Sequence, residues 1–217
     1  MLERLPLFIF NLLDKILILI QINVDKPVNT INISAFTDKI SDRDLEQLCA
    51  DNPETKFETT PEGKLIVMSP TGSESGRKNG KLFFQVELWN TKTKLGATFD
   101  SSTGFKLSNG AIRSPDVSWI ENAKWNSLTL SQQRKFAPID PDFVIELMSP
   151  TDDLVELQQK MLEYMDCGVR LGWLINPDDK QVEIYRLGQE KEVLNNPKTL
   201  SGEDILPKLT VNLADIF

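Results

Sequence analysis

The stretch "PDFVIELMSPTDD", residues 141–153, contains the strand that decides the fold. From Phe143 to Met148 every residue except Glu146 is apolar, so both faces of this strand are apolar. Strands of this kind lie in the centre of a sheet that is covered on both sides. An unpaired carboxylate in such an interior costs several kcal/mol, so the sequence predicts either a positive partner for Glu146 or a cleft beside it.

The composition excludes several classes of protein. The 217 residues suit one soluble domain, and the net charge of −8 rules out a broad basic surface for nucleic acid. The sequence contains no histidine, which removes Ser-His-Asp and Cys-His catalysis and most zinc enzymes. Enzyme chemistry here would rest on carboxylates, lysine, hydroxyl groups or a cation held by oxygen ligands. Cys49 and Cys167 are far apart and in no metal-ligand spacing, which favours reduced thiols in a cytoplasmic protein.

Residues 1–30 have the composition of an extension and linker, and residues 31–217 have that of the folded domain. Within the extension, residues 5–22 are mostly apolar and about as long as a membrane span. The adjacent charges of Asp14 and Lys15 disfavour a span, and no cleavage site for secretion follows. We expect a peripheral extension, with a packed helix and a membrane anchor as the alternatives.

Helical and strand patterns alternate along the domain. A helix is expected near 152–167, with Ser149 as its N-cap and Pro150 at its first position. The pattern predicts an α/β (α+β) domain whose central mixed sheet is flanked by helices. Further helices are expected near 41–52 and 71–96, and strands at 57–59, 64–68, 97–100, 103–107, 114–120, 142–148, 171–177 and 180–187.

Two of the predicted strands each carry one acidic residue among apolar neighbours, Asp116 and Glu146. Lys160 and Tyr164 lie on the helix after the second strand, four residues apart and therefore on one face. Because that helix returns along the sheet, Lys160 can approach Glu146 and offset its charge. Two carboxylates beside a lysine favour a Mg²⁺ site at which the lysine stabilises a phosphate.

Several segments, in this order and spacing, resemble the Uma2 (DUF820) family, a bacterial branch of the PD-(D/E)XK restriction-endonuclease-like superfamily. The resemblance covers about residues 57–217 and implies a mixed sheet with an αβββαβ nuclease core. The segments are "GKLIVMSPTGSESG" (63–76), "RSPDVSWI" (113–120), "PDFVIELMSPTDD" (141–153), "KMLEY" (160–164), "CGVRLGWLINP" (167–177) and "VEIYR" (182–186).

The resemblance implies a role for particular residues. Asp116 falls on the motif aspartate, Glu146 on the (D/E) position and Glu74 on the acid of the first helix. The superfamily's lysine belongs two positions after the acid, where this chain has Met148. The resemblance to the Uma2 family implies that the lysine lies on the following helix instead, at Lys160.

The implied reaction is metal-assisted hydrolysis of DNA phosphodiester bonds, giving a 5′-phosphate. Asp116 and Glu146 would bind Mg²⁺ or Mn²⁺ together with the Leu147 carbonyl, and Glu74 would act from the outer shell of ligands. Lys160 would assist the attacking water, and Tyr164, which matches a helix tyrosine of the superfamily, would hold the lysine or a phosphate. The superfamily often forms homodimers, and the acidic charge restricts any DNA contact to a local one.

Each of these residues also has an ordinary structural interpretation. Asp116 can cap a turn, Glu74 can close a capping box with Thr71, and Tyr164 can be a core residue. Lys160 can pair with Glu156 on the helix surface.

A second function is consistent with the same residues. Met148 at the usual lysine position and the net charge of −8 also suit a degenerate nuclease fold that serves as a binding or regulatory module. A third, membrane attachment through residues 5–22, is the least favoured.

Overall fold

The computed structural model describes residues 28–31, 40–52, 55–68 and 70–217. The apolar segment 5–22 lies outside these residues. Among the helices in the described ranges, none is long and apolar enough to cross a membrane.

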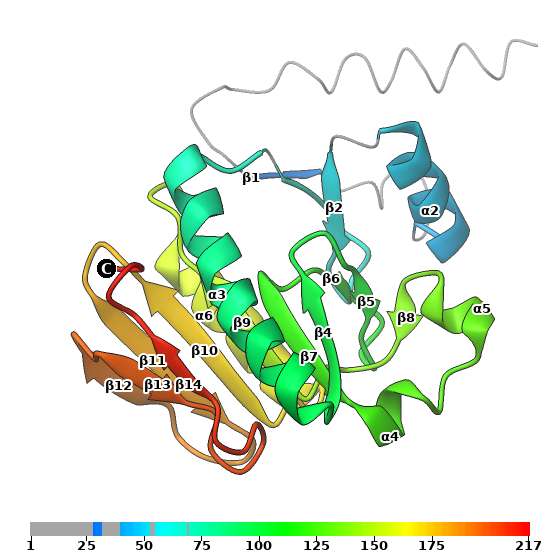
Figure 1. Ribbon diagram of the computed structural model, residues 1–217. Coiled ribbons are helices and arrows are strands. Elements are labelled where there is room, and N and C mark those ends of the chain that lie inside the picture. The colour runs from blue at the N-terminus through cyan, green and yellow to red at the C-terminus, as the bar shows by residue number, and fades with distance from the viewer. Residues whose placement is uncertain (1–27, 32–39, 53–54, 69) are drawn as a thin grey trace, which may run out of the picture.

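The centre of the molecule is a mixed sheet with the strand order β12-β11-β10-β9-β7-β4 (Figure 1). β9 and β10 pair in parallel, and helix α6 (Leu154–Asp166) makes the crossover between them. The other neighbouring strands pair antiparallel. The bounds of these strands are β4 Gly96–Asp100, β7 Val117–Glu121, β9 Phe143–Leu147, β10 Leu171–Asn176, β11 Gln181–Arg186 and β12 Glu192–Asn195.

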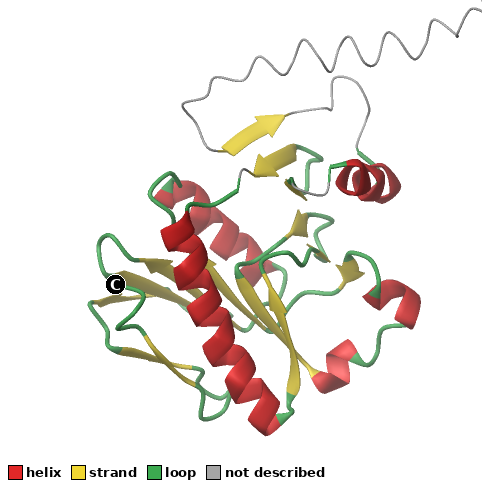
Figure 2. Cartoon of the chain, turned by 45° about the horizontal axis from the view of Figure 1, so that its top comes forward, coloured by secondary structure: helices red, strands yellow, loops and turns green. Residues whose placement is uncertain are grey.

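A second sheet, with the order β1-β3-β2-β6-β5-β8, lies near the end of the main sheet where α3 (Ser73–Thr93) begins (Figures 1 and 2). Its strand β1 (Val28–Ile31) pairs with β3 (Leu65–Met68), so part of the expected linker is a strand. The remaining elements are α2 Asp42–Asp51, β2 Lys56–Thr59, β5 Phe105–Lys106, β6 Ile112–Arg113, α4 Asn122–Trp125, α5 Leu130–Gln133, β8 Ala137–Pro138, β13 Thr199–Ser201 and β14 Thr210–Asn212.

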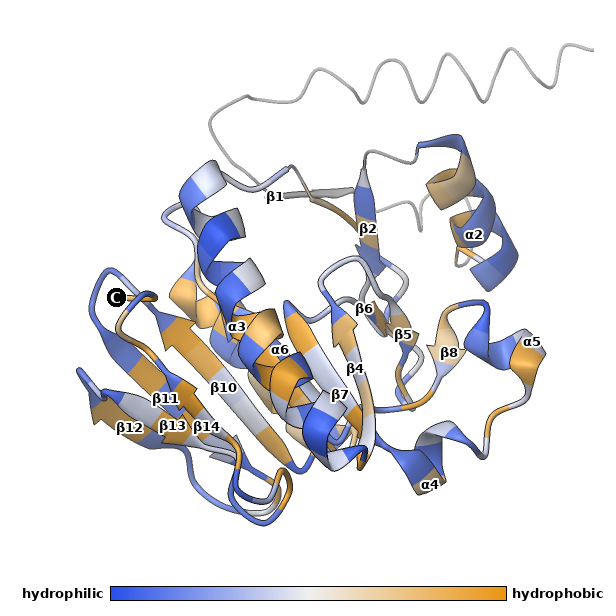
Figure 3. Cartoon of the chain, in the orientation of Figure 1, coloured by the Kyte–Doolittle hydropathy of each residue, from blue (hydrophilic) through white to orange (hydrophobic). Residues whose placement is uncertain are grey.

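Both faces of the main sheet are covered, as the apolar run in β9 predicts. Phe143, Ile145 and Leu147 pack on α3 and the C-terminal segment, whereas Val144 packs on α6. The strands β9 and β10 are accordingly among the most apolar parts of the chain, while the first half of α3 is polar (Figure 3). Burying one large apolar side chain stabilises a fold by about 1.5–3 kcal/mol, so this double-sided core holds the strand that carries Glu146 in place.

Both helices that flank the sheet begin differently from the sequence prediction. α6 starts at Leu154 with Asp153 as its N-cap, because Asp153 Oδ1 accepts the backbone N–H groups of Val155 and Glu156. Ser149 lies before a turn and its N–H donates to Asp152 instead, so the prediction of Ser149 as N-cap is wrong.

α3 has Gly72 as its N-cap, and no side chain caps it. The capping box expected from Thr71 and Glu74 is therefore not formed.

A pair of glycine substitutions tests the packing of the sheet edge. A Cβ at Gly96 in β4 would overlap the Ile120 carbonyl oxygen and the Trp119 ring, so Gly96→Ala should destabilise the protein by about 1–3 kcal/mol. Gly80 lies on the exposed side of α3 with no atom within 4 Å of an added Cβ. Gly80→Ala should therefore stabilise by about 0.5–1 kcal/mol. Urea unfolding measures both, and equal effects would contradict the packing described at β4.

Candidate active site

The two predicted acids lie opposite each other at the ends of neighbouring strands. β7 and β9 pair antiparallel with Val117 opposite Ile145, so the register continued by one residue sets Asp116 opposite Glu146. Residues opposite each other in such a ladder share a face and have Cβ atoms about 5 Å apart. The Leu147 N–H donates to Asp116 Oδ2 at 2.8 Å, which ties Asp116 to the end of β9. The strands thus bring both carboxylates to one place.

Helix α6 supplies the positive partner that the buried Glu146 requires. Nζ of Lys160 lies 2.9 Å from Glu146 Oε1, and the Tyr164 hydroxyl donates to the same oxygen at 2.8 Å. Glu146 is 5% exposed and Tyr164 is fully buried. An ammonium and a hydroxyl therefore offset the charge of Glu146 inside the protein. Lys160 makes this buried contact in place of the surface ion pair with Glu156 that the sequence also allowed.

A third carboxylate, Glu58 of β2, joins the cluster from the second sheet. Its Oε1 lies 3.0 Å from Nζ of Lys160 and accepts the Ser114 N–H at 2.8 Å. Its Oε2 lies 3.2 Å from Nη1 of Arg113, and Arg113 also pairs with Glu163 of α6. Sequence analysis missed Glu58, because a single acid in a short hairpin strand ordinarily faces solvent.

The pKa values of the carboxylates in the cluster shift in two directions. Burial raises the pKa of Glu146 to about 7, because Asp116 and Glu58 add to the effect of burial and Lys160 opposes it only in part. Burial likewise raises the pKa of Asp116. Burial acts in the same direction on Glu58, but Lys160 and Arg113 outweigh it, so the pKa of Glu58 lies below its ordinary value.

Lys160 stays protonated in the same surroundings. Burial by itself would lower the pKa of Lys160, but the carboxylates of Glu146 and Glu58 raise it above the ordinary value. The burial of Tyr164 and the charge of Glu146 raise the pKa of the phenol, so Tyr164 remains a hydrogen-bond donor. The cluster therefore keeps an ammonium and a neutral hydroxyl beside a carboxylate of raised pKa.

Glu74 does not join this cluster. Its side chain is 75% exposed in the first turn of α3 and forms an ion pair with Lys78, four residues further along the helix. From the same helix, Asn79 donates to Asp116 Oδ1 at 2.7 Å. Asn79 is a neighbour of the site that sequence analysis missed, since its amide has no distinctive pattern.

The donor groups fit a hard divalent cation at an open site. Within the described ranges, no three His, Cys, Asp or Glu side chains are grouped so that they could hold a metal ion. Mg²⁺, however, needs one or two carboxylates together with water and phosphate oxygens, and Oε2 of Glu146 accepts no hydrogen bond from the described residues. When fully ionised, the cluster has two more carboxylates than cations, a deficit that one divalent ion would balance; its charged members are Glu58, Asp116, Glu146, Glu163, Arg113 and Lys160.

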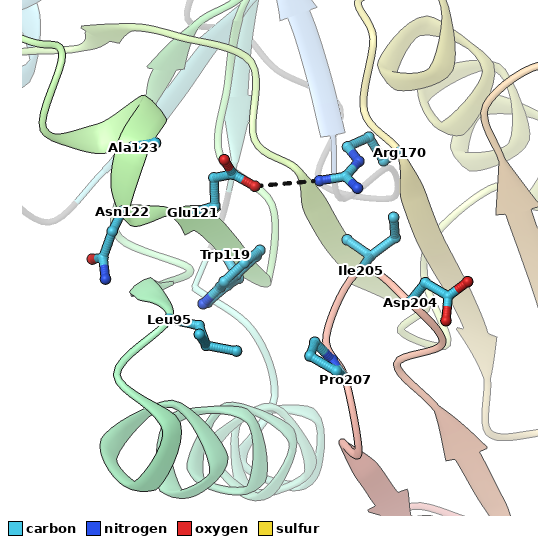
Figure 4. A pocket seen from close by; sticks show the side chains of 9 residues that line it. All are labelled: Leu95, Trp119, Glu121, Asn122, Ala123, Arg170, Asp204, Ile205 and Pro207. Carbon is cyan, nitrogen blue, oxygen red and sulfur yellow. Dashed lines mark hydrogen bonds and ion pairs between the residues drawn. The ribbon is translucent and has the colours of Figure 1, made fainter.

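A separate cavity of about 340 Å³ lies at the other end of β7. Glu121, the last residue of β7, and Arg170 form an ion pair of 3.5 Å beside it (Figure 4). Asp116 precedes the first residue of the same strand, so the cavity is distinct from the carboxylate cluster. The full lining is Leu95, Trp119, Glu121, Asn122, Ala123, Arg170, Asp204, Ile205 and Pro207.

Comparisons with known proteins find a matching family model and similar solved structures. A family model described as "Uma2: Putative restriction endonuclease" matches residues 42–214. A crystal structure of "a putative nuclease belonging to DUF820" from Anabaena variabilis shares 22% sequence identity and has a TM-score of 0.67, covering 82% of this chain and 97% of that chain. This likeness confirms the expected restriction-endonuclease-like fold. No curated protein matches the sequence.

The raised pKa of Glu146 gives a prediction about stability and pH. A carboxyl whose pKa is near 7 when folded and 4.5 when unfolded binds its proton more tightly in the folded state. Stability is therefore lost as pH rises through this window, by up to about 3 kcal/mol. Because only the wild type loses this stability, the free energy of unfolding of Glu146→Gln should rise relative to that of the wild type as the pH is raised from about 5 to about 8. Urea unfolding at both pH values measures the difference.

Glu183→Gln is the matched control for this measurement. Glu183 is equally buried, but the hydroxyl of Tyr185 and other donors overcome the effect of burial and lower its pKa. A carboxyl with a lowered pKa contributes its full stabilisation above the ordinary pKa of 4.5. The difference in unfolding free energy between Glu183→Gln and the wild type should therefore stay level over the same pH range. A level difference for Glu146→Gln as well would contradict the raised pKa.

Proposed function

The chain belongs to the Uma2 family, and from that premise we propose that it is an endonuclease that hydrolyses DNA phosphodiester bonds with Mg²⁺ or Mn²⁺. The descriptions of the family and of the DUF820 neighbour both name a nuclease. The observation that carries the proposal is the position of Lys160, 2.9 Å from Glu146, where the strand register sets Asp116 opposite. Two acids and an ammonium at one place are the groups that such a hydrolysis uses.

Asp116 and Glu146 are the residues we propose to hold the cation, with the Leu147 carbonyl as a further ligand. Their oxygens suit Mg²⁺ or Mn²⁺, which favour carboxylate, carbonyl and water ligands. When bound, the cation would supply Lewis-acid stabilisation of the negative charge on the phosphate. Asn79 and the Leu147 N–H fix the Asp116 carboxylate, so little rearrangement is needed at that residue.

Lys160 is the residue we propose to contact the phosphodiester. Its side chain is 12% exposed, so the ammonium is largely desolvated. A desolvated positive charge stabilises the developing charge of a phosphoryl transition state more strongly than one in water. Tyr164 donates to the same oxygen of Glu146 that Lys160 contacts, so the other carboxylate oxygen would be available to a cation. The helix-borne lysine thereby replaces the one expected at the position of Met148.

The charge on the surface agrees with a local contact to DNA. The protein has a net charge of −8, and two of the basic side chains at the start of α3 are already paired with acids, Lys78 with Glu74 and Lys81 with Asp215. Arg77, in the same turn, is exposed. We propose that DNA is held mainly by the cation and the site itself, so cleavage should depend strongly on divalent metal.

Substitution of the cluster tests the assignment. Glu146→Gln and Lys160→Met should each lower Mn²⁺-dependent cleavage of plasmid DNA by about 100-fold or more, because each removes a group that stabilises the transition state. Glu190→Gln, at an exposed position in the turn after β11, should cleave like the wild type. Cleavage rates that are unchanged in both cluster variants would sink the assignment.

Metal binding separates this proposal from the alternative of a binding module. Calorimetric titration should show Mn²⁺ binding to the wild type and its loss in Asp116→Ala, because Asp116 is one of only two proposed carboxylate ligands. A wild type that binds no Mn²⁺ would favour the degenerate module instead.

A further inference from the structure

We infer that Glu58 is a positioning residue that holds the Lys160 ammonium beside Glu146 when a cation engages Glu146. The inference rests on the proposed function and extends it to the second sheet. Glu58 is 2% exposed and comes from β2, whereas Lys160 comes from α6, more than one hundred residues later. Their contact of 3.0 Å is nearly as close as the contact of 2.9 Å between Lys160 and Glu146.

Glu58 is held more firmly than an ordinary partner of a lysine. Oε1 accepts both Lys160 and the backbone N–H of Ser114, and Oε2 pairs with Arg113. A backbone donor and a guanidinium cannot follow the lysine if it moves, so they fix the carboxylate in one orientation. The ammonium therefore has one rigid acceptor, at Glu58, and one acceptor that it must share, at Glu146.

The shared acceptor explains why a second one is needed. A divalent cation on Glu146 would draw negative charge away from the carboxylate that Lys160 contacts. A buried ammonium that loses its counter-charge is costly, and without another acceptor it would turn towards solvent. Glu58 is not opposite Asp116 in the strand register and stays available to the lysine. It can therefore keep the ammonium in place throughout the reaction.

Arg113 and Glu163 reinforce this role of Glu58. Arg113 joins Glu58 of the second sheet to Glu163 of α6, three residues after Lys160 on the same helix. The helix is therefore tied to β2 at two points, through Lys160 and through Glu163. These two ties set the distance between α6 and β2, and with it the place of the ammonium.

The chain contains a matched control for the burial of Glu58. Glu183 of β11 is 4% exposed, pairs with Lys191 at 2.9 Å and accepts the Tyr185 hydroxyl. The register through Leu174 places Glu183 two strands from Glu146, about 10 Å away. Glu183 also accepts a hydrogen bond from Gln158 of α6. Glu183→Gln therefore removes a buried glutamate from a lysine, a tyrosine and helix α6 while leaving the contacts of Lys160 itself unchanged.

A double-mutant cycle tests the inference. Glu58→Gln should lower kcat by about 10- to 100-fold with KM changed by less than about threefold, since a positioning defect is felt in the transition state. In a Lys160→Met background the same substitution should cause no further loss, because it acts through the lysine. Glu58→Asp should recover part of the rate. Glu183→Gln should shift thermal stability to a similar extent while kcat stays near that of the wild type.

A second measurement needs no activity. In ¹⁵N NMR the Lys160 ammonium, identified by its absence from Lys160→Met, should give a signal protected from exchange with water. We expect Glu183→Gln to retain this signal and Glu58→Gln to lose or displace it. An unchanged signal in Glu58→Gln overturns the inference whether or not the wild type cleaves DNA. Equal loss of kcat by Glu58→Gln in both backgrounds also overturns it, and leaves the nuclease assignment intact.

Discussion

The Lys160 ammonium, shared between Glu146 and Glu58, is the interaction on which the arrangement of the site depends. It lets a strand that is apolar on both faces carry a carboxylate in its middle, at a position 5% exposed. Without the Lys160 ammonium close by, the desolvation of Glu146 would cost several kcal/mol, and β9 would be less stable at the centre of the sheet. The same ammonium joins the two sheets, because its partners lie on β9 and β2. One contact thus serves both the fold and the proposed chemistry.

The neighbours of each carboxylate determine what it can do. Glu58 and Glu146 are both almost fully buried, yet their pKa values move in opposite directions. Glu58 faces Arg113 as well as Lys160, whereas Glu146 faces Lys160 and two other acids. Glu58 therefore remains an ionised partner of Lys160 and Arg113, whereas Glu146 is the carboxylate whose charge the proposed metal ion would stabilise. Such opposed shifts within one cluster are typical of functional sites.

Part of this organisation can be predicted from the sequence. The uninterrupted apolar run of β9 and the acids at positions 116 and 146 carry their own signals, because buried strands rarely contain charge. The spacing of Lys160 and Tyr164 on α6 follows from helical periodicity. Glu58 could not be predicted, since its role depends on the pairing of β2 with β6, which short-range patterns do not specify. The place of Glu74, exposed and paired with Lys78, could not be predicted for a related reason, because position on a helix does not determine which way that side of the helix faces.

The join between the two sheets has a consequence for how the protein fails under stress. The second sheet contains several strands of only two residues, and its strands β2, β3 and β6 pack through a small apolar cluster, whereas the main sheet has a large core on each side. Regions with few buried apolar contacts open at lower free energy than the global transition. A partial opening at β2 would carry Glu58 away while β7, β9 and α6 remain folded. Heating should therefore abolish the proposed activity at a lower temperature than the one at which the main sheet unfolds.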